Sequence, residues 1–238
     1  FCLSFFGFAH KLIIVDADNT IWGGIIGEDG FSNVKIGSIF PGNLYETFQK
    51  ELKLLKNRGA VLALCTKNNI NDINEAFTKI KSMPLKINDF VSIRANWKTK
   101  TENIISILKE LNLNANNTLF IDDSPQEIEL VLKSIEDIST YLLPRNPSEF
   151  INCLYKVGIF DNLNISKEDL ERSKLYLQEN KRINLKESSK NYEKYLQDLK
   201  MNQIINFANI DNLKRLSQLT QKTNQFNSTT LRLSELEI

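Results

Sequence analysis

Short apolar runs that alternate with helix-like patterns are the feature of this sequence that most constrains the fold. The first run, LIIV, is apolar at every position, which is typical of a strand buried on both faces. Between the runs, apolar residues recur every three or four positions, as they do along one face of a helix. This alternation predicts an α/β fold with a parallel sheet and helices on both of its faces. The predicted strands are residues 12–15, 61–65, 90–93, 119–121 and 140–143.

The helical patterns also predict where some helices begin or end and which side chains face the core. Gly59 follows the first pattern and is expected to cap its carboxyl end. Ser124 and Pro125 form a helix start, with Ser124 as the N-cap. The core-facing residues are expected to be Leu44, Phe48, Leu52 and Leu55, then Ile73, Phe77 and Ile80, then Ile104, Ile105, Leu108 and Leu111, and finally Ile128, Val131, Leu132 and Ile135.

Polar residues stand directly after three of the predicted strands. Asp16 and Asp18 follow the first strand, Thr66 ends the second and Asp122 follows the fourth. Ligands of such sheets bind at the carboxyl ends of the strands, so these side chains are expected to share one rim. Two carboxylates at this spacing suit phosphoryl transfer, in which one attacks phosphorus, the other moves a proton and a divalent cation neutralises charge. Alternatively, Asp18 and its neighbour simply form an Asx turn.

Composition limits the class of partner and the cellular compartment. Lys and Arg number 30 against 29 Asp and Glu, and the net charge of +1 gives no reason to expect nucleic acid or an acidic membrane as a partner. The 3 cysteines are too few and too scattered for a disulfide framework or a zinc site. We therefore expect a reducing, cytoplasmic location.

The two ends of the chain differ in character from its middle. The chain starts FCLSFFGFAH, without Met, and is expected to be the inside of a longer protein. Residues 1–150 are expected to form the catalytic domain, and residues 151–238 a helical extension and linker towards a missing carboxyl-terminal region. Three helices are expected there, one opened by Ser166 and Asp169, one marked by Tyr192, Tyr195, Leu196 and Leu199, and one by Leu213, Leu216 and Leu219, before an irregular TNQFNSTT segment.

Longer motifs around these residues resemble one protein family. The pattern D-x-D-x-T continues as W-G-G-x-x-G-E-D-G, the second strand ends in LCTKNN, and the fourth strand ends in two adjacent acids. These motifs resemble the haloacid dehalogenase (HAD) superfamily, subfamily IIIC, and within it the FkbH-like proteins. The resemblance implies Asp16 as nucleophile and Asp18 as general acid and base. It also implies that the Thr66 hydroxyl holds the phosphoryl oxygens, although Thr66 could instead cap the following helix.

The same resemblance implies a lysine, a metal ion and a set of substrate contacts. Lys100, three residues after Trp97, is the expected charge-compensating lysine, and Lys98 is the alternative. Mg²⁺ is expected on Asp16, Asp18 through its carbonyl, Asp123 and Asp122, because this ion prefers oxygen ligands. Glu127 could support the metal site or, as we favour, complete a capping box with Ser124. The resemblance further places Thr20, Gly23, Gly24, Lys67 and Asn68 beside a phosphorylated small-molecule substrate, the two glycines leaving room for a ligand.

Spacing argues that the site is open. The segments between the first motif and Thr66, and between Thr66 and Lys100, hold only a loop, two helices and one strand. Neither segment has room for the cap domain that many HAD enzymes carry. An open site suits a large substrate such as a carrier protein.

FkbH-like resemblance also implies a reaction. Such proteins are thought to take a glyceryl group from bisphosphoglycerate, release phosphate and pass the acyl unit to an acyl carrier protein. Cys65 could carry the acyl group, although a small core residue is the simpler interpretation. The alternatives are a plain phosphatase acting on another phosphoester and a non-enzymatic scaffold in a biosynthetic assembly.

Overall fold

A computed structural model describes residues 10–155, 160, 167–188, 196–197, 202, 204–205, 207–210, 212–222 and 231–238. The chain divides into two compact units, Phe1–Asn184 and Leu185–Ile238, which are described separately. The first unit continues past residue 150, where the sequence changes character. The predicted domain organisation stays a prediction.

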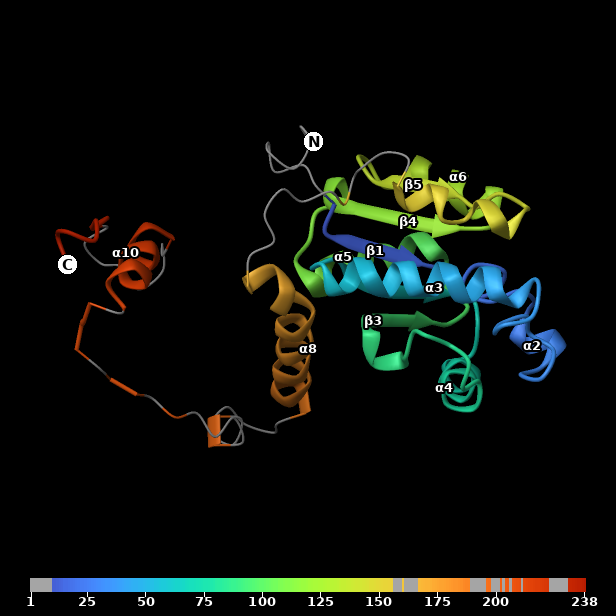
Figure 1. Ribbon diagram of the computed structural model, residues 1–238, viewed down its shortest axis with the longest axis horizontal. Coiled ribbons are helices and arrows are strands. Elements are labelled where there is room, and N and C mark those ends of the chain that lie inside the picture. Colours follow the sequence, from blue (N-terminus) through green and yellow to red (C-terminus); the bar gives the residue numbers. More distant parts are fainter. Residues whose placement is uncertain are drawn as a thin grey trace. The chain divides into compact units, whose positions relative to one another are not determined.

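The first unit is built on a parallel sheet of five strands in the order β3-β2-β1-β4-β5 (Figure 1). Central β1 pairs in parallel with both of its neighbours, and Leu12 lies opposite Val61 on one side and Thr118 on the other. This arrangement confirms the predicted parallel α/β fold. The strands are β1 (Leu12–Val15), β2 (Val61–Thr66), β3 (Phe90–Ala95), β4 (Thr118–Asp122) and β5 (Ser139–Leu142).

Helices cover both faces of the sheet, as predicted. On one face α3 and α4 pack against Ile13 and Val15, and on the other α5 and α6 pack against Leu12 and Ile14. Because side chains of a strand point alternately to opposite faces, each face of β1 contributes to a separate core. The helices of this unit are α2 (Ile26–Asp29), α3 (Gly42–Asn57), α4 (Ile70–Lys79), α5 (Lys100–Leu111), α6 (Pro125–Ser134), α7 (Asn152–Tyr155) and most of α8 (Lys167–Ser188), with 3₁₀ turns at Ile87–Asp89, Ala115–Asn117 and Pro147–Glu149.

Two of the predicted core-facing residues point to solvent instead. Ile105 and Leu132 are each about half exposed, whereas Ile107 is fully buried. Adjacent helical positions are separated by about 100°, so a residue next to a buried one turns away from the core. The prediction for Gly59 is confirmed, because α3 ends at Asn57 and Gly59 adopts a φ of 100° just after the C-cap residue.

Helix α8 lies at the amino ends of two strands, away from the arrowheads in Figure 1. Arg172 Nη1 donates to the carbonyl of Gly59 at 2.8 Å, just before β2. Asn180 Nδ2 donates to the carbonyl of Val91 at 2.9 Å, near the start of β3. Helix α8 therefore belongs to the same compact unit as the sheet.

The predicted carboxyl-terminal helices are found wherever the structure describes them. Helix α8 starts at Lys167, as expected, and α10 covers Leu213–Lys222. Most of the helix predicted between them lies outside the described residues, although residues 196–197 are helical. The TNQFNSTT segment also lies outside them. Among the helices that the structure describes, none has the length and apolar character that a membrane span requires.

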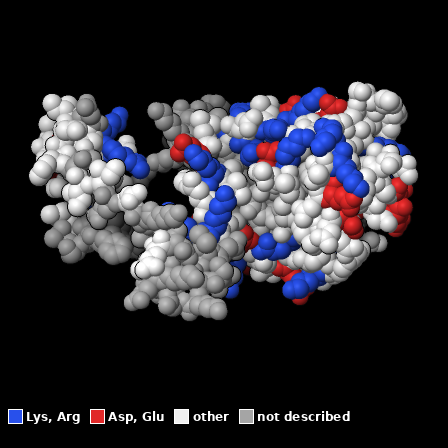
Figure 2. Space-filling view, turned by 90° about the horizontal axis from the view of Figure 1, so that it is seen from below, with Lys and Arg blue, Asp and Glu red and all other residues white. Residues whose placement is uncertain are grey.

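The charge on the face shown in Figure 2 is mixed. Lys and Arg side chains extend over much of this face, and groups of Asp and Glu lie among them. This face therefore presents both signs of charge.

Candidate active site at the carboxyl rim of the sheet

A buried ammonium joins two carboxylates at the carboxyl ends of neighbouring strands. Asp16 directly follows β1, is only 5% exposed and donates its backbone N–H to the carbonyl of Ile121 at 3.1 Å. Lys100 Nζ lies 3.1 Å from Asp16 Oδ1 and 2.5 Å from Asp122 Oδ2. The helix that starts at Lys100 therefore brings a positive charge under the rim of the sheet.

The start of α5 explains why Lys100, and not Lys98, occupies this place. Thr99 is the N-cap of α5, and its hydroxyl accepts from the N–H of Glu102 at 3.2 Å. The Glu102 carboxylate accepts from the Thr99 N–H in return, which completes a capping box. Lys100 is thus the first residue of the helix and points inward, whereas Lys98 lies in the preceding loop and is exposed.

Burial shifts the protonation of these charged groups. Burial raises the pKa of Asp16 to about 6, although the neighbouring Lys100 opposes this shift. Burial likewise raises the pKa of Asp122. For Lys100, burial lowers the pKa, but the carboxylates of Asp16 and Asp122 outweigh burial and raise it above its usual value. The buried site thus holds two carboxylates for one ammonium.

A third carboxylate completes a cluster that suits a divalent cation. Oxygen atoms of Asp16, Asp122 and Asp123 lie within 4.8 Å of one another. Asp16 Oδ1 is buried and, in the described part of the chain, accepts no hydrogen bond despite its nearness to Lys100. Asp122 already accepts from Lys100 and from the N–H of Ser124. Asp16 and the partly exposed Asp123 are therefore the best placed to ligate a hard cation, which prefers oxygen atoms.

Asp18 lies apart from this cluster, and its carboxylate is held by three donors. Oδ1 accepts from Trp22 Nε1 at 2.9 Å and from the N–H of Ile26 at 3.1 Å. Oδ2 accepts from Asn68 Nδ2 at 2.8 Å. Asn19, which together with Asp18 was the alternative for an Asx turn, accepts at Oδ1 from the N–H of Gly24, five residues further on and not two as an Asx turn requires. The contact of Trp22 with Asp18 was not predicted from the sequence. The spacing of four residues between them could have indicated it.

The residues after β2 extend the same network. The Thr66 hydroxyl accepts from Asn68 Nδ2 at 3.0 Å, so Asn68 bridges Thr66 and Asp18. The N-cap of α4 is Asn69, which removes helix capping as the explanation for Thr66. The Lys67 side chain is partly exposed and forms an ion pair with Glu127 of α6.

Glu127 does not complete the capping box that we favoured from the sequence. The Ser124 hydroxyl does accept from the N–H of Glu127, at 3.4 Å, as expected for an N-cap. The Glu127 carboxylate, however, lies 2.5 Å from Lys67 Nζ. An ion pair with Lys67, in the loop after β2, therefore replaces the local backbone contact.

The loop after Asp18 packs tightly against neighbouring side chains. Thr20 is fully buried. A side chain at Gly23 would meet the ring of Tyr45 at 2.8 Å, and one at Gly24, where φ is 101°, would meet the Asp29 carboxylate at 2.6 Å. These glycines therefore permit tight packing of the loop. The space that we expected them to leave for a ligand is occupied by the side chains of Tyr45 and Asp29.

Cys65 faces the core beneath α5. Its side chain is fully buried, and its sulfur lies 3.9 Å from the carbonyl of Lys100. Burial raises the pKa of the Cys65 thiol to about 12. A protonated, enclosed thiol is a poor nucleophile, which favours the interpretation of Cys65 as a core residue.

An open cavity of about 530 Å³ gives access to the acids of the rim. Trp97, which served only as a sequence landmark, is 71% exposed at this cavity, and its Nε1 donates to Asn69 Oδ1 at 3.2 Å. Thr20, Gly23 and Gly24 are outside its described lining. The described lining residues are Asp16, Asp18, Asn19, Ile25, Gly27, Glu28, Lys67, Asn68, Asn69, Asp72, Trp97 and Asp123.

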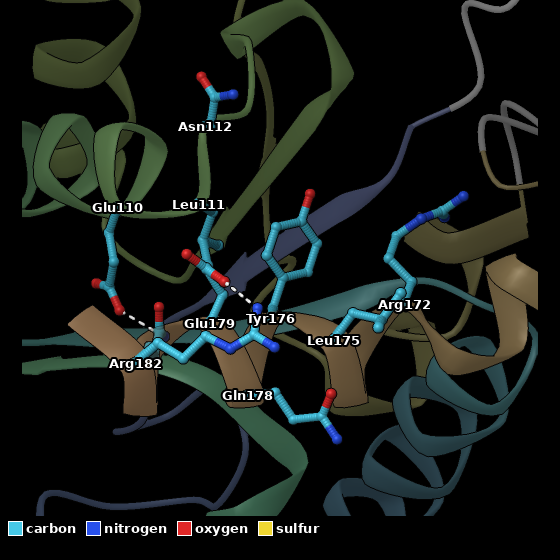
Figure 3. Close-up of a pocket in the computed structure, with 10 residues that line it drawn as sticks. Glu110, Leu111, Asn112, Arg172, Leu175, Tyr176, Gln178, Glu179 and Arg182 are labelled. Atoms are coloured by element: carbon cyan, nitrogen blue, oxygen red, sulfur yellow. Dashed lines mark hydrogen bonds and ion pairs between the residues drawn. The ribbon is translucent and has the colours of Figure 1, made fainter. Parts of the chain in front are cut away.

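A second cavity, of about 470 Å³, lies between the end of α5 and α8 (Figure 3). Glu110 comes from α5 and accepts from Asn180 Nδ2 at 2.7 Å, while Glu179 and Arg182 pair within α8 at 3.3 Å. The other charged lining residue, Arg172, donates to the carbonyl of Gly59, so each charged residue in the described lining has a protein partner. Because α5 starts at the carboxyl rim and ends here, this cavity is separate from the candidate active site.

Comparison with solved structures decides the fold family. No protein-family model matches the sequence, and no curated protein matches it. The N-terminal part of BF1531 from Bacteroides fragilis, which contains a phosphatase domain and is complexed with Mg, aligns with a TM-score of 0.66 at 35% identity. The chain has a HAD-like fold.

Other structures with this HAD-like fold align less closely. A predicted HAD-like family hydrolase from Porphyromonas gingivalis is 15% identical, with a TM-score of 0.43 over 63% of this chain and 98% of its own. A HAD-superfamily hydrolase of Geobacter sulfurreducens is also 15% identical, with a TM-score of 0.43 over 61% of this chain and 100% of its own. The alignment with BF1531 covers 68% of this chain and 44% of the Bacteroides fragment, so this chain matches less than half of that fragment.

Proposed function

We propose that this HAD-like domain is a Mg²⁺-dependent phosphoryl-transfer enzyme with Asp16 as its nucleophile. One observation carries the proposal: Asp16 is buried, incompletely compensated and lines a cavity together with Asp18 and Asp123. A perturbed carboxylate in a cleft, beside a lysine and further acids, is a typical arrangement for catalysis. The magnesium ion of the 35% identical phosphatase domain supports the choice of metal.

The proposed reaction has two steps. An Asp16 oxygen forms a bond to phosphorus while the bond from phosphorus to the leaving oxygen breaks, and Asp18 gives that oxygen a proton. Asp18 then takes a proton from water, which attacks the aspartyl phosphate, so that phosphate leaves and Asp16 is regenerated. The contacts from Trp22 and Asn68 keep the Asp18 carboxylate oriented for both proton transfers.

Other residues would stabilise charge during these steps. Asp16, Asp123 and the carbonyl of Asp18 would hold Mg²⁺, with Asp122 beside them, and the ion would neutralise charge between the nucleophile and the phosphate. Lys100 neutralises part of the buried negative charge around Asp16. The Thr66 hydroxyl and Asn68, which are joined by a hydrogen bond, would contact phosphoryl oxygens.

Hydrolysis of p-nitrophenyl phosphate tests this proposal. We expect phosphate release that requires Mg²⁺ and stops on chelation. The Asp16→Asn variant should lose at least about a thousandfold in kcat, since the attacking group is removed. Asp89→Asn is a matched control, because Asp89 is also a buried carboxylate but lies outside the described lining of the cavity. Turnover retained by Asp16→Asn would refute the assignment.

We further propose, on the FkbH-like sequence motifs, that the donor is bisphosphoglycerate and that the glyceryl group passes to an acyl carrier protein. The open cavity supports a large acceptor. Mass spectrometry of a carrier protein after incubation with enzyme and donor tests this step, and a glyceryl adduct is expected. Free phosphate without an adduct would support a plain phosphatase. Tight carrier binding without any hydrolysis would support a scaffold.

A further inference from the structure

Charge is distributed unevenly around the candidate active-site cavity. Its described lining contains five carboxylates, from Asp16, Asp18, Glu28, Asp72 and Asp123. Lys67 is the one basic residue in that described lining. A substrate that carries negative charge beyond its phosphate therefore meets repulsion around most of the cavity wall, and attraction at Lys67.

Lys67 is tied to the opposite side of the site in the structure. Its Nζ lies 2.5 Å from Glu127 Oε1, with side chains that are 41% and 14% exposed. The pair joins the end of β2 to the first turn of α6, across the ends of two strands that flank β1. Glu127 makes this contact in place of the capping contact to the backbone of Ser124.

An ordinary surface pair on the same helix provides a comparison. Lys133 Nζ lies 2.6 Å from Glu129 Oε1, within one turn of α6, and the two side chains are 68% and 67% exposed. That pair is local in sequence and outside the described lining of the cavity. The Lys67–Glu127 pair is instead long-range in sequence, and its lysine lines the cavity.

We propose that Lys67 binds a second anionic group of the substrate, and that Glu127 is the partner of Lys67 in the free enzyme, which this group displaces. The proposal rests on the proposed function and defines its substrate class, a phosphomonoester with a carboxylate or a further phosphate on its leaving group. With phosphorus at Asp16, the rest of the substrate occupies the same cavity as Lys67. The ammonium exchanges the Glu127 carboxylate for the anion of the substrate, and no bond other than this ion pair changes.

The exchange explains how a site rich in acids could prefer an anionic leaving group. In the described lining, Lys67 is the one residue that can form an ion pair with a negatively charged group of the substrate. Because Glu127 competes for Lys67, the binding free energy that the substrate gains is reduced by the energy of the Lys67–Glu127 ion pair. This energy is small for a partly exposed pair. A leaving group without charge makes no such exchange and leaves the pair intact.

Two matched substrates test the proposal. 3-Phosphoglycerate and glycerol 3-phosphate share a skeleton and differ in a carboxylate against a hydroxymethyl group. We expect the wild-type enzyme to favour 3-phosphoglycerate in kcat/KM. Lys67→Met should lower kcat/KM on 3-phosphoglycerate by about tenfold or more and should change the value on glycerol 3-phosphate by less than about threefold.

Glu127→Gln provides a readout that a purely structural ion pair would not give. Releasing Lys67 should lower KM for 3-phosphoglycerate by about two- to fivefold while kcat and the values for glycerol 3-phosphate stay the same. Glu129→Gln and Lys133→Met are the matched controls and should leave the ratio of the two substrates unchanged. Equal losses on both substrates in Lys67→Met and Glu127→Gln would overturn the proposal.

Failure of this inference can be told from failure of the proposed function. If p-nitrophenyl phosphate is hydrolysed but the two matched substrates are used equally, the inference alone is overturned. If no phosphoester is hydrolysed, the proposed function fails. Binding of both compounds to the Asp16→Asn protein, measured by calorimetry, then still decides whether Lys67 selects the carboxylate. Equal affinities there overturn the inference, and weaker binding of 3-phosphoglycerate after the added Lys67→Met change supports it.

Discussion

Two buried carboxylates at opposite ends of the sheet have shifts in pKa of opposite sign. Asp89 is 8% exposed and lies just before β3, where it accepts from Lys56 Nζ at 2.6 Å and from the Lys86 N–H at 2.8 Å. Burial raises the pKa of Asp89, but these donors outweigh burial and lower it overall. Asp16 is 5% exposed and shares a single ammonium with Asp122, and burial raises its pKa to about 6.

Under the proposed function, Asp89 serves the fold and Asp16 serves the chemistry. Asp89 is fully provided with donors and ties α3 to the start of β3. Asp16 is buried without enough compensation, which costs stability and leaves it ready for a cation and an electrophile. Replacing each of these two carboxylates with an amide should therefore change the free energy of unfolding in opposite directions.

The largest effect on stability is expected from Lys100→Met, which should leave the carboxylates at the carboxyl rim even less compensated than Asp89. Removing the ammonium leaves the buried carboxylates of Asp16 and Asp122 without their shared cation, and loss of one partner of a buried ion pair costs about 3–5 kcal/mol. Urea unfolding of the metal-free protein measures this loss, with Lys98→Met as the matched control. A change within about 0.5 kcal/mol, as is usual for an exposed lysine, would contradict the expectation.

Asp16→Asn should reverse the sign and stabilise the metal-free protein, by at most about 3 kcal/mol. The folded pKa of about 6 exceeds the unfolded value of 3.8, so the contribution of Asp16 is present below about pH 4 and is lost as the pH rises to about 6. The free energy of unfolding of the variant should therefore increasingly exceed that of the wild type as the pH rises across this range. Unfolding free energies measured with chelator between pH 4 and pH 8 test this. A variant that loses stability as the pH rises would contradict it.

Asp89→Asn should have the smallest of these effects, a loss of about 1.5–2 kcal/mol at neutral pH, because the amide replaces a charge-assisted acceptor. The folded pKa of Asp89 is lowered, so its contribution is present above the unfolded pKa and is lost as the pH falls through the folded value. The difference in free energy of unfolding between the wild type and the variant should thus become smaller at acidic pH. Activity on p-nitrophenyl phosphate should stay at the wild-type level, and a loss would mean that the two ends of the sheet are coupled.

Much of this site follows from local pattern. Asp16, Thr66 and Asp122 were predicted to share a rim because parallel strands place their carboxyl ends at one edge of the sheet. The structure places all three there, with the predicted Lys100 beneath them. Gly59 was predicted because a helix end needs a residue that tolerates positive φ.

The less successful predictions concern contacts that local pattern does not encode. The capping motif at Ser124 is a property of a few adjacent residues, yet the partner of the Glu127 carboxylate is Lys67, which lies in the loop after β2 and is distant in sequence. Exposure of Ile105 and Leu132 likewise depends on which side of the helix meets the sheet. Hydrophobic spacing leaves that rotation uncertain when apolar residues are adjacent.

The sequence by itself determined the α/β alternation and the carboxyl-end position of the acids, because these depend on strand burial and on residues close together in the chain. Only the tertiary structure decided that Asn68 joins Asp18 to Thr66, that Trp22 orients Asp18 and that Lys67 turns to Glu127. Such contacts depend on the relative positions of side chains from separate elements. Those positions are set by how the helices pack on the sheet.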